Sequence, residues 1–96
     1  MAATLGVLGL SALFGISPLE WAAIVAAIGL VWVAEALNTA VEHLADAVTK
    51  DLHPRIRDAK DLAAGAVLAA AATAFVVGLI VFVPYLLTLF VTLGGA

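Results

Sequence analysis

Residues 18–48 carry the sequence PLEWAAIVAAIGLVWVAEALNTAVEHLADAV, and this stretch decides the fold. As one helix it would be about 45 Å long, at 1.5 Å per residue. The hydrocarbon core of a bilayer is only roughly 30 Å thick. We therefore expect a membrane-spanning helix whose far, more polar end projects into water.

The composition of the whole chain supports the same interpretation. Of 96 residues, 66% are hydrophobic and 11% are charged, cysteine is absent, and the formal net charge is −3. A soluble chain of this length buries only about 60–65% of the surface that it exposes when unfolded. The composition excludes a soluble monomer, a disordered chain, a disulfide scaffold and a basic nucleic-acid binder. It predicts an all-α integral membrane protein.

Two further apolar stretches flank the central one, so we expect a single domain over residues 1–96. The first stretch is only about 22 Å long as a helix, which is short for a span. The tail after Tyr85 either prolongs the third helix or lies along the membrane surface. The expected spans cover residues 2–16, 18–48 and 60–85.

Local motifs mark the ends of these segments. Ser17, Pro18 and Glu20 form a helix-start signal with a capping box. Leu52-His53-Pro54 breaks the helical pattern, and we expect a polar loop from there to about Ala59.

The charges are concentrated in one window, because ten of the eleven charged side chains lie between Glu35 and Asp61. The loop between the second and third helices holds all the basic residues, which makes it cytoplasmic by the positive-inside rule. These are Lys50, Arg55, Arg57 and Lys60.

A polar stripe follows the second helix within this window. Its members fall within an arc of roughly 100° on one helical face. A carboxylate inside a span costs roughly 2.5–3.5 kcal/mol, so it indicates a functional site. Three acids on one face repel each other, and a bound Mg²⁺ would relieve that repulsion. The stripe comprises Glu35, Asn38, Thr39, Glu42 and Asp46.

Simpler interpretations remain open for the same residues. The stripe is also consistent with the water-exposed end of a long helix. Lys60 is also consistent with a residue that anchors its helix at the membrane edge. Asp61 suits the first turn of a helix, where a carboxylate is favourable by itself. His53, next to Pro54, suits a solvated loop.

The ordered pattern resembles a known family of enzymes. It consists of E-x-x-N-T-A-x-E-x-x-x-D from Glu35, D-x-H-P from Asp51, and A-K-D-x-A-A-G-A-V-L from Ala59. This string is similar to that of the small bacterial membrane diacylglycerol kinases and undecaprenol kinases. Residues 17–21, His53-Pro54 and the segment from 78 to 84 look closer to the undecaprenol kinase branch.

The resemblance implies a homotrimer of three-span subunits, with active sites between neighbouring subunits. The implied reaction is ATP- and Mg²⁺-dependent phosphorylation of a lipid hydroxyl, with undecaprenol favoured and diacylglycerol next. The implied location is the cytoplasmic side of the bacterial inner membrane. The partners are then the lipid, ATP and further copies of the chain.

The resemblance also implies a role for each matching residue. Glu35 is the catalytic base, and Glu42 is the ligand of Mg²⁺. The lipid contacts are Glu35, Asn38 and Ala64, and the nucleotide contacts are Glu42, Asp46, Asp51, Leu52, His53, Lys60 and Asp61.

The chain departs from the family pattern at its beginning. Family members normally start with an amphipathic surface helix that carries a second metal-binding carboxylate. This sequence instead starts at Met1 directly with the first apolar span. On that comparison the chain is a start-site truncation, a fragment or a member that has lost activity, and we expect weak Mg²⁺ binding and little or no turnover.

The alternative function is a small oligomeric transporter or pore with an intramembrane glutamate. That class predicts an acid near mid-membrane and no clustered loop chemistry. Here the acids gather near the cytoplasmic edge beside Lys60 and Asp61, which favours the kinase. The chain lacks the G-x-x-x-x-G-K-[ST] motif, so the ATP site is not of the P-loop type.

Overall fold

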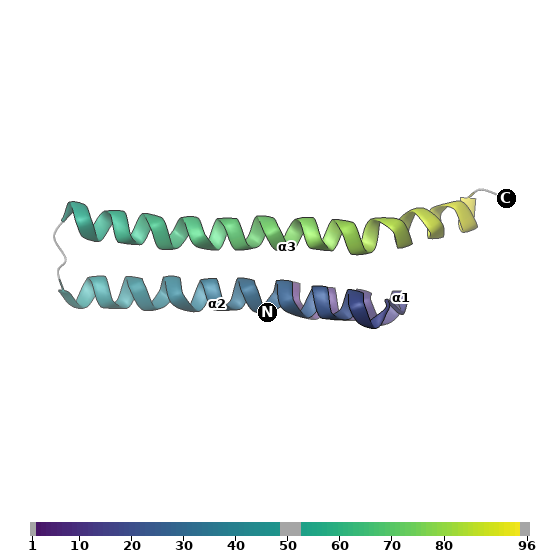
Figure 1. The fold of residues 1–96 in the computed structure, drawn as a ribbon, viewed down its shortest axis with the longest axis horizontal. Coiled ribbons are helices and arrows are strands. Elements are labelled where there is room, and N and C mark those ends of the chain that lie inside the picture. Colours follow the sequence, from purple (N-terminus) through teal and green to yellow (C-terminus); the bar gives the residue numbers. More distant parts are fainter. Residues whose placement is uncertain (1, 49–52, 95–96) are drawn as a thin grey trace.

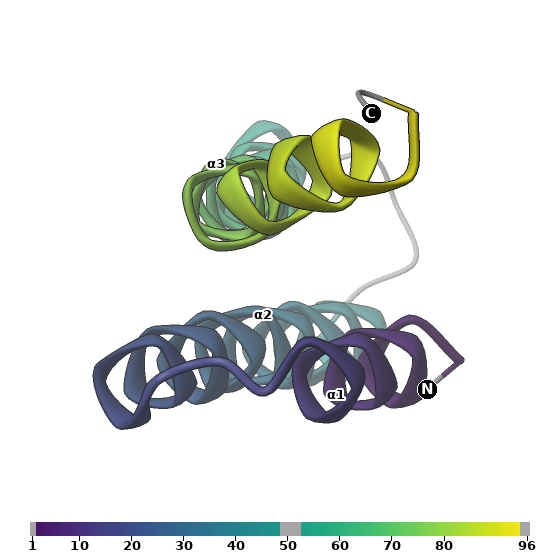
Figure 2. The ribbon, with the colours of Figure 1, turned by 90° about the vertical axis from the view of Figure 1, so that its right-hand side faces the viewer.

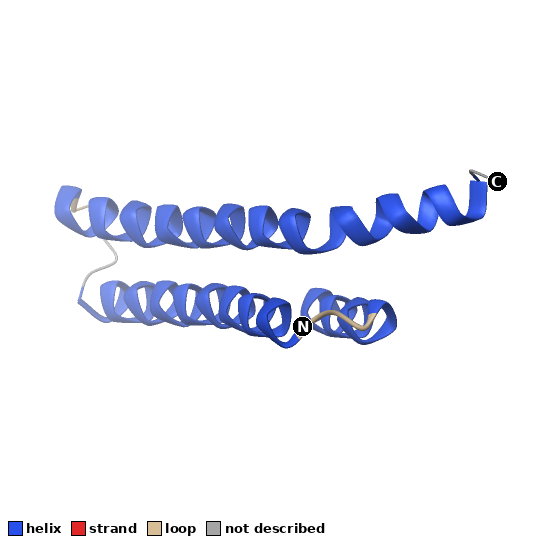
Figure 3. Ribbon diagram, turned by 45° about the vertical axis from the view of Figure 1, so that its right-hand side comes forward, coloured by secondary structure: helices blue, strands red, loops and turns tan. Residues whose placement is uncertain are grey.

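The computed structural model describes residues 2–48 and 53–94, which form three helices: α1 (Ala2–Phe14), α2 (Pro18–Val48) and α3 (Pro54–Gly94). α2 and α3 form a long antiparallel hairpin, with an overall extent of 64 × 21 × 20 Å (Figure 1). Along that axis, α1 and α2 lie side by side in one layer and α3 in another (Figure 2). The described residues contain helices and short connections only (Figure 3), which confirms the all-α prediction.

α2 and α3 are both long and apolar enough to cross a membrane. Only 11% of the apolar window of each helix is buried, unlike the core helix of a soluble protein. Together with the composition, this makes the chain an all-α membrane protein. α1 has 13 residues and is about 20 Å long, so a third crossing by this segment stays a prediction.

A tight turn at Gly15 ends α1 two residues before the end of the expected span. Gly15 has a φ of 61°, and its N–H and that of Ile16 both donate to Ser11 O, at 3.1 and 3.4 Å. This is the usual glycine termination of a helix. The capping box then starts α2, since Ser17 N donates to Glu20 Oε1 at 2.9 Å and Glu20 N to Ser17 Oγ at 3.2 Å. The predicted start signal is confirmed.

α3 begins earlier than the sequence suggested, so the expected polar loop to Ala59 is wrong. Pro54 occupies the first helical position, where a missing N–H costs nothing. His53 caps this helix, because its Nδ1 accepts from Arg55 N at 3.2 Å and its carbonyl from Arg57 N at 2.9 Å. The His-Pro pair is therefore the start of a helix, and not a break followed by a loop.

α3 also continues past the expected end of the third span. It passes through Pro84 and reaches Gly94, so the apolar tail prolongs the helix. Pro84 cannot donate to the preceding turn, and α3 curves near this end (Figure 1). Beyond it, Thr88 Oγ1 donates to Pro84 O at 2.9 Å.

A small core joins the three helices at the end opposite to the charges. Ile16, Ile24 and Val81 are buried there. The ring of Phe14 stacks on that of Tyr85, with 5.8 Å between the centroids. The Tyr85 hydroxyl also donates to Glu20 Oε1, so the first turn of α2 is tied to α3.

Candidate active site at the charged end of the hairpin

The predicted polar stripe lies on the half of α2 that leads to the charged end. Glu35, Glu42 and Asp46 are exposed there, one or two helical turns apart. Asn38 is half-buried and faces the hairpin partner α3. The stripe thus combines carboxylates open to the surroundings with one amide turned toward a groove.

That groove lies between α2 and α3 and has a volume of about 380 Å³. Its wall on α3 consists of small side chains, among them Ala63, Ala66 and Ala70. Asn38 Oδ1 is buried at its edge without a hydrogen-bond partner. Such an unsatisfied oxygen costs about 1–3 kcal/mol, so a hydroxyl or amine of a ligand could satisfy it. Ala64, the expected lipid contact, is exposed on α3 and does not line this groove.

An ion pair closes the charged end of the hairpin. Lys60 Nζ lies 2.9 Å from Asp46 Oδ1. Lys60 precedes the apolar part of α3, which starts at Leu62. The hydrogen bond to Asp46 raises the pKa of the Lys60 ammonium, and the negative charges of Asp46 and Glu42 act in the same direction. Lys60 is therefore a permanent cation held beside the acidic stripe.

The remaining expected nucleotide contacts lie around the start of α3. His53 and Asp61 are both exposed. Because His53 Nδ1 accepts the hydrogen bond that caps α3, the proton of the neutral ring belongs on Nε2. Two other predicted contacts, Asp51 and Leu52, lie outside the described residues.

Among residues 2–48 and 53–94, no group of three or more carboxylate, histidine or cysteine side chains could hold a metal ion. Mg²⁺ usually keeps several waters and binds through one or two carboxylates together with substrate phosphates. Glu42, one turn from Asp46, fits that mode as a single carboxylate.

The pairing of Lys60 with Asp46 was not among the expected contacts, although the sequence contains a signal for it. Asp46 and Lys60 lie seven residues before and after His53. In an antiparallel hairpin of two helices, residues at similar distances from the connection lie at the same level along the helix axes. The arrangement offers three groups for chemistry. These are the Glu35 carboxylate on an apolar helix, the Asn38 Oδ1 beside it without a hydrogen-bond partner, and the Lys60 ammonium nearer the water.

Comparison with known proteins gives three consistent results. The family described as prokaryotic diacylglycerol kinase matches residues 1–82. The chain is 42% identical over 85 residues to the undecaprenol kinase of Bacillus subtilis (strain 168), which covers 88% of this chain and 69% of that protein. It is 48% identical over 63 residues to the diacylglycerol kinase of Synechocystis sp. (strain ATCC 27184 / PCC 6803 / Kazusa), covering 65% of this chain and 36% of that protein. No solved structure gives a significant match.

These matches agree with the motif in residues 35–66. Both relatives are named as kinases, one of undecaprenol and one of diacylglycerol, which confirms the prediction of a phosphotransferase and not a transporter or pore. The chain belongs to the prokaryotic diacylglycerol kinase family.

Proposed function

We propose that this chain transfers the terminal phosphate of ATP to the hydroxyl of a membrane lipid at the cytoplasmic edge of the inner membrane. Undecaprenol is the favoured acceptor, because the relative that covers most of this chain is an undecaprenol kinase. Diacylglycerol is the next candidate, after the second relative.

One observation carries the proposal: a single face of α2 leads from the apolar part of the hairpin to its charged end. Glu35 and Asp46 lie at the two ends of the stripe, eleven residues or about 16 Å apart. A lipid can therefore keep its tail in hydrocarbon while its hydroxyl meets Glu35. A nucleotide can approach from the water, where Lys60 is paired with Asp46.

At the lipid end, the Glu35 carboxylate accepts the proton of the lipid hydroxyl as the oxygen attacks the terminal phosphorus. The new bond joins the lipid oxygen to phosphorus, and the bond between that phosphorus and the bridging oxygen breaks, which releases ADP. Asn38 lies one helical turn from Glu35, so its amide N–H can donate to the lipid oxygen while the single hydroxyl proton of the lipid goes to Glu35. No covalent intermediate on the enzyme is needed, since positioning and electrostatics supply most of the catalysis.

At the nucleotide end, Lys60 and His53 Nε2–H are the donors for phosphate oxygens. Glu42 would hold the Mg²⁺ that accompanies ATP, and this ion would neutralise charge on the phosphates. Asp46 holds the Lys60 ammonium beside the stripe through the 2.9 Å contact. Asp61 is a further nucleotide contact, because it belongs to the same motif.

The same proposal includes the assembly. Small residues such as Gly65 and Ala69 let membrane helices approach closely, and both are exposed on α3. A homotrimer of three-span subunits would cover such faces and bring residues of a second copy beside the stripe. The described part of one chain offers Mg²⁺ few ligands, which agrees with a site shared between copies.

A lipid phosphorylation assay tests the proposal. The purified chain is incubated in mixed micelles with Mg²⁺, ATP labelled in the terminal phosphate, and either undecaprenol or diacylglycerol, and the lipids are separated by thin-layer chromatography. The label that the chain transfers should appear in undecaprenol first, even at a low rate of turnover, and Glu35→Gln should reduce it at least about a hundredfold, as for other general bases. Glu20→Gln is the matched control, because Glu20 lies at the opposite end of α2 and glutamine keeps an acceptor for Tyr85.

Two results would contradict the proposal. Label in neither lipid would remove the kinase activity, and full activity of Glu35→Gln would remove Glu35 as the base.

A further inference from the structure

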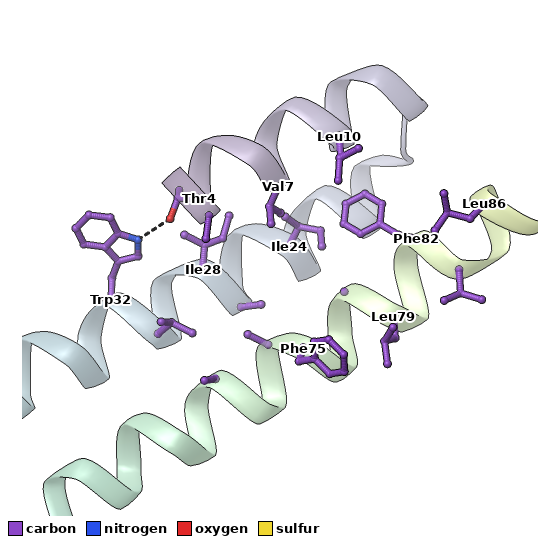
Figure 4. A pocket seen from close by; sticks show the side chains of 17 residues that line it. Thr4, Val7, Leu10, Ile24, Ile28, Trp32, Phe75, Leu79, Phe82 and Leu86 are labelled. Atoms are coloured by element: carbon purple, nitrogen blue, oxygen red, sulfur yellow. Dashed lines mark hydrogen bonds between the residues drawn. The ribbon is translucent and has the colours of Figure 1, made fainter. Parts of the chain in front are cut away.

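An apolar pocket of about 470 Å³ lies between all three helices, apart from the stripe. α1 contributes Val7, α2 contributes Ile28 and Val31, and α3 contributes Gly78 and Phe82. Figure 4 shows side chains of α1 and α2 facing those of α3 across this space. Along α3 the lining runs from residue 71 to residue 86, a length of about 22 Å. We call it the three-helix groove.

The two polar side chains that line the three-helix groove are hydrogen-bonded to each other. Its polar side chains are Thr4 and Trp32, and Trp32 Nε1 donates to Thr4 Oγ1 at 3.1 Å. This hydrogen bond also holds the start of α1 against α2 (Figure 4). Because the groove lies along the apolar part of two helices that could cross a membrane, it favours an apolar occupant such as a hydrocarbon chain.

The groove ends next to the proposed catalytic base. Ile28 and Val31 line it, and Glu35 follows at spacings of seven and four residues, which places all three on one face of α2. Glu35 therefore stands one helical turn beyond the last lining residue of that face. A chain lying in the groove would end at the level of the carboxylate.

We propose that the three-helix groove binds the hydroxyl-proximal part of a single lipid tail and so presents the alcohol to Glu35. The inference rests on the proposed kinase function and extends it from the head of the substrate to its tail. It assigns lipid contacts to α1 and to the outer half of the hairpin, where the motif places none.

The volume limits the ligand to one chain. An apolar cavity of about 150 Å³ holds one benzene molecule, so about 470 Å³ takes on the order of 20 carbon atoms. That corresponds to the first few isoprene units of a polyprenol or to one acyl chain. A polyprenol has a single tail, so the groove can hold the part of that tail nearest the hydroxyl and no second chain has to be placed elsewhere. The second chain of diacylglycerol would have to lie outside it.

Binding is tested by fluorescence, which needs no turnover. The chain has two tryptophans, so Trp21→Phe leaves Trp32 in the groove as the only one. We expect octadecanol dibrominated at mid-chain to quench Trp32 saturably at low mole fraction, and undecaprenol to reverse the quenching. Dibrominated phosphatidylcholine serves as the control for bulk lipid.

A blocked groove gives the matched variant, made in the Trp21→Phe background for the fluorescence measurement. A Cβ added at Gly78 meets no atom within 4 Å, and Gly78 lines the groove, so Gly78→Leu should place its side chain in the groove without disturbing the helix backbone. Gly29→Leu is the control, since Gly29 also has open space around it but does not line the groove. We expect Gly78→Leu to weaken binding of the brominated alcohol about tenfold, the effect of losing burial for roughly two methylene groups. Gly29→Leu should bind normally.

The outcomes separate the two proposals. Saturable quenching that Gly78→Leu weakens, without phosphorylation of any lipid, would support the groove and reject the kinase. Lipid phosphorylation with equal KM for undecaprenol in Gly78→Leu and the wild type would overturn the groove alone. Quenching that rises linearly, as with the brominated phosphatidylcholine, would show bulk lipid in the groove. No quenching at all would show that the alcohol does not enter the groove, and either result overturns the inference.

Discussion

Lys60 Nζ lies 2.9 Å from Asp46 Oδ1, so the second turn of α3 is joined to the last turn of α2. Both side chains are accessible, with 39% of Lys60 and 62% of Asp46 exposed. Exposed ion pairs contribute little to stability. The pair therefore matters chiefly for placing a cation beside the stripe.

Lys60→Met should reduce activity much more than stability. Without the cation, we expect the KM for ATP to rise and kcat to fall, together at least tenfold in kcat/KM, whereas the thermal midpoint changes little. Kinetics over a range of ATP concentrations and thermal unfolding in detergent measure the two effects. Arg57→Met is the control, because it removes an exposed cation one turn away on the same helix. An equal loss in both variants would mean that only general positive charge matters.

The ion pair should be insensitive to pH over the physiological range. The pKa of Lys60 in the folded chain is raised by its hydrogen bond to Asp46. Its contribution is therefore complete below the unfolded value of about 10.4 and is lost only as the pH rises through the higher folded value. The ratio of kcat/KM for ATP between wild type and Lys60→Met should therefore stay constant from about pH 7 to about pH 9, because Lys60 keeps its charge throughout. A ratio that falls to one within this range would contradict the pairing.

The sequence predicted features that depend on neighbouring residues. The bounds of α2 and the Ser17–Glu20 capping box follow from local patterns, and the structure has both as expected. The error at the start of α3 is also local. A proline suits either a break or the first position of a helix, and the choice depended on the ring of His53 acting as a cap.

Other features depend on contacts between distant residues, so local patterns could not predict them. Trp32 and Thr4 are 28 positions apart, and Tyr85 and Glu20 are 65 apart. The orphan Oδ1 of Asn38 exists only because α3 covers it. The motif could identify the residues of the stripe, but the groove beside it required the hairpin.

His53 should have two separable roles. His53→Ala removes the cap of α3 and should lower the free energy of unfolding by about 1 kcal/mol, a typical loss for a cap. His53→Asn restores a capping acceptor but lacks the ring N–H, so it should keep the stability and still lose affinity for ATP. Chemical unfolding in detergent and ATP kinetics on both variants check this. Normal ATP affinity in His53→Asn would leave His53 with the capping role alone.

Gly15 should tolerate substitution poorly, because its φ of 61° lies in the left-handed region. Gly15→Ala should lower the free energy of unfolding by roughly 1–2 kcal/mol, and Gly15→Asn by less. Gly6→Ala is the control with the opposite sign, since Gly6 is inside α1 and has open space for a methyl group. There alanine should stabilise the helix. Unfolding curves that place both alanine variants on the same side of the wild type would contradict this account of the turn.

Tyr85→Phe should loosen the end of the hairpin opposite to the charges. The change removes the hydrogen bond to Glu20 but keeps a ring to stack on Phe14, so it isolates the hydroxyl. We expect a lower thermal midpoint for Tyr85→Phe and a smaller decrease for Glu20→Gln, because glutamine still accepts from Tyr85. The KM for ATP should not change in either variant, because the 25 residues from Lys60 to Tyr85 separate the two ends by about 38 Å. If Tyr85→Phe were as stable as the wild type, the stacked rings rather than the hydrogen bond would hold this end together.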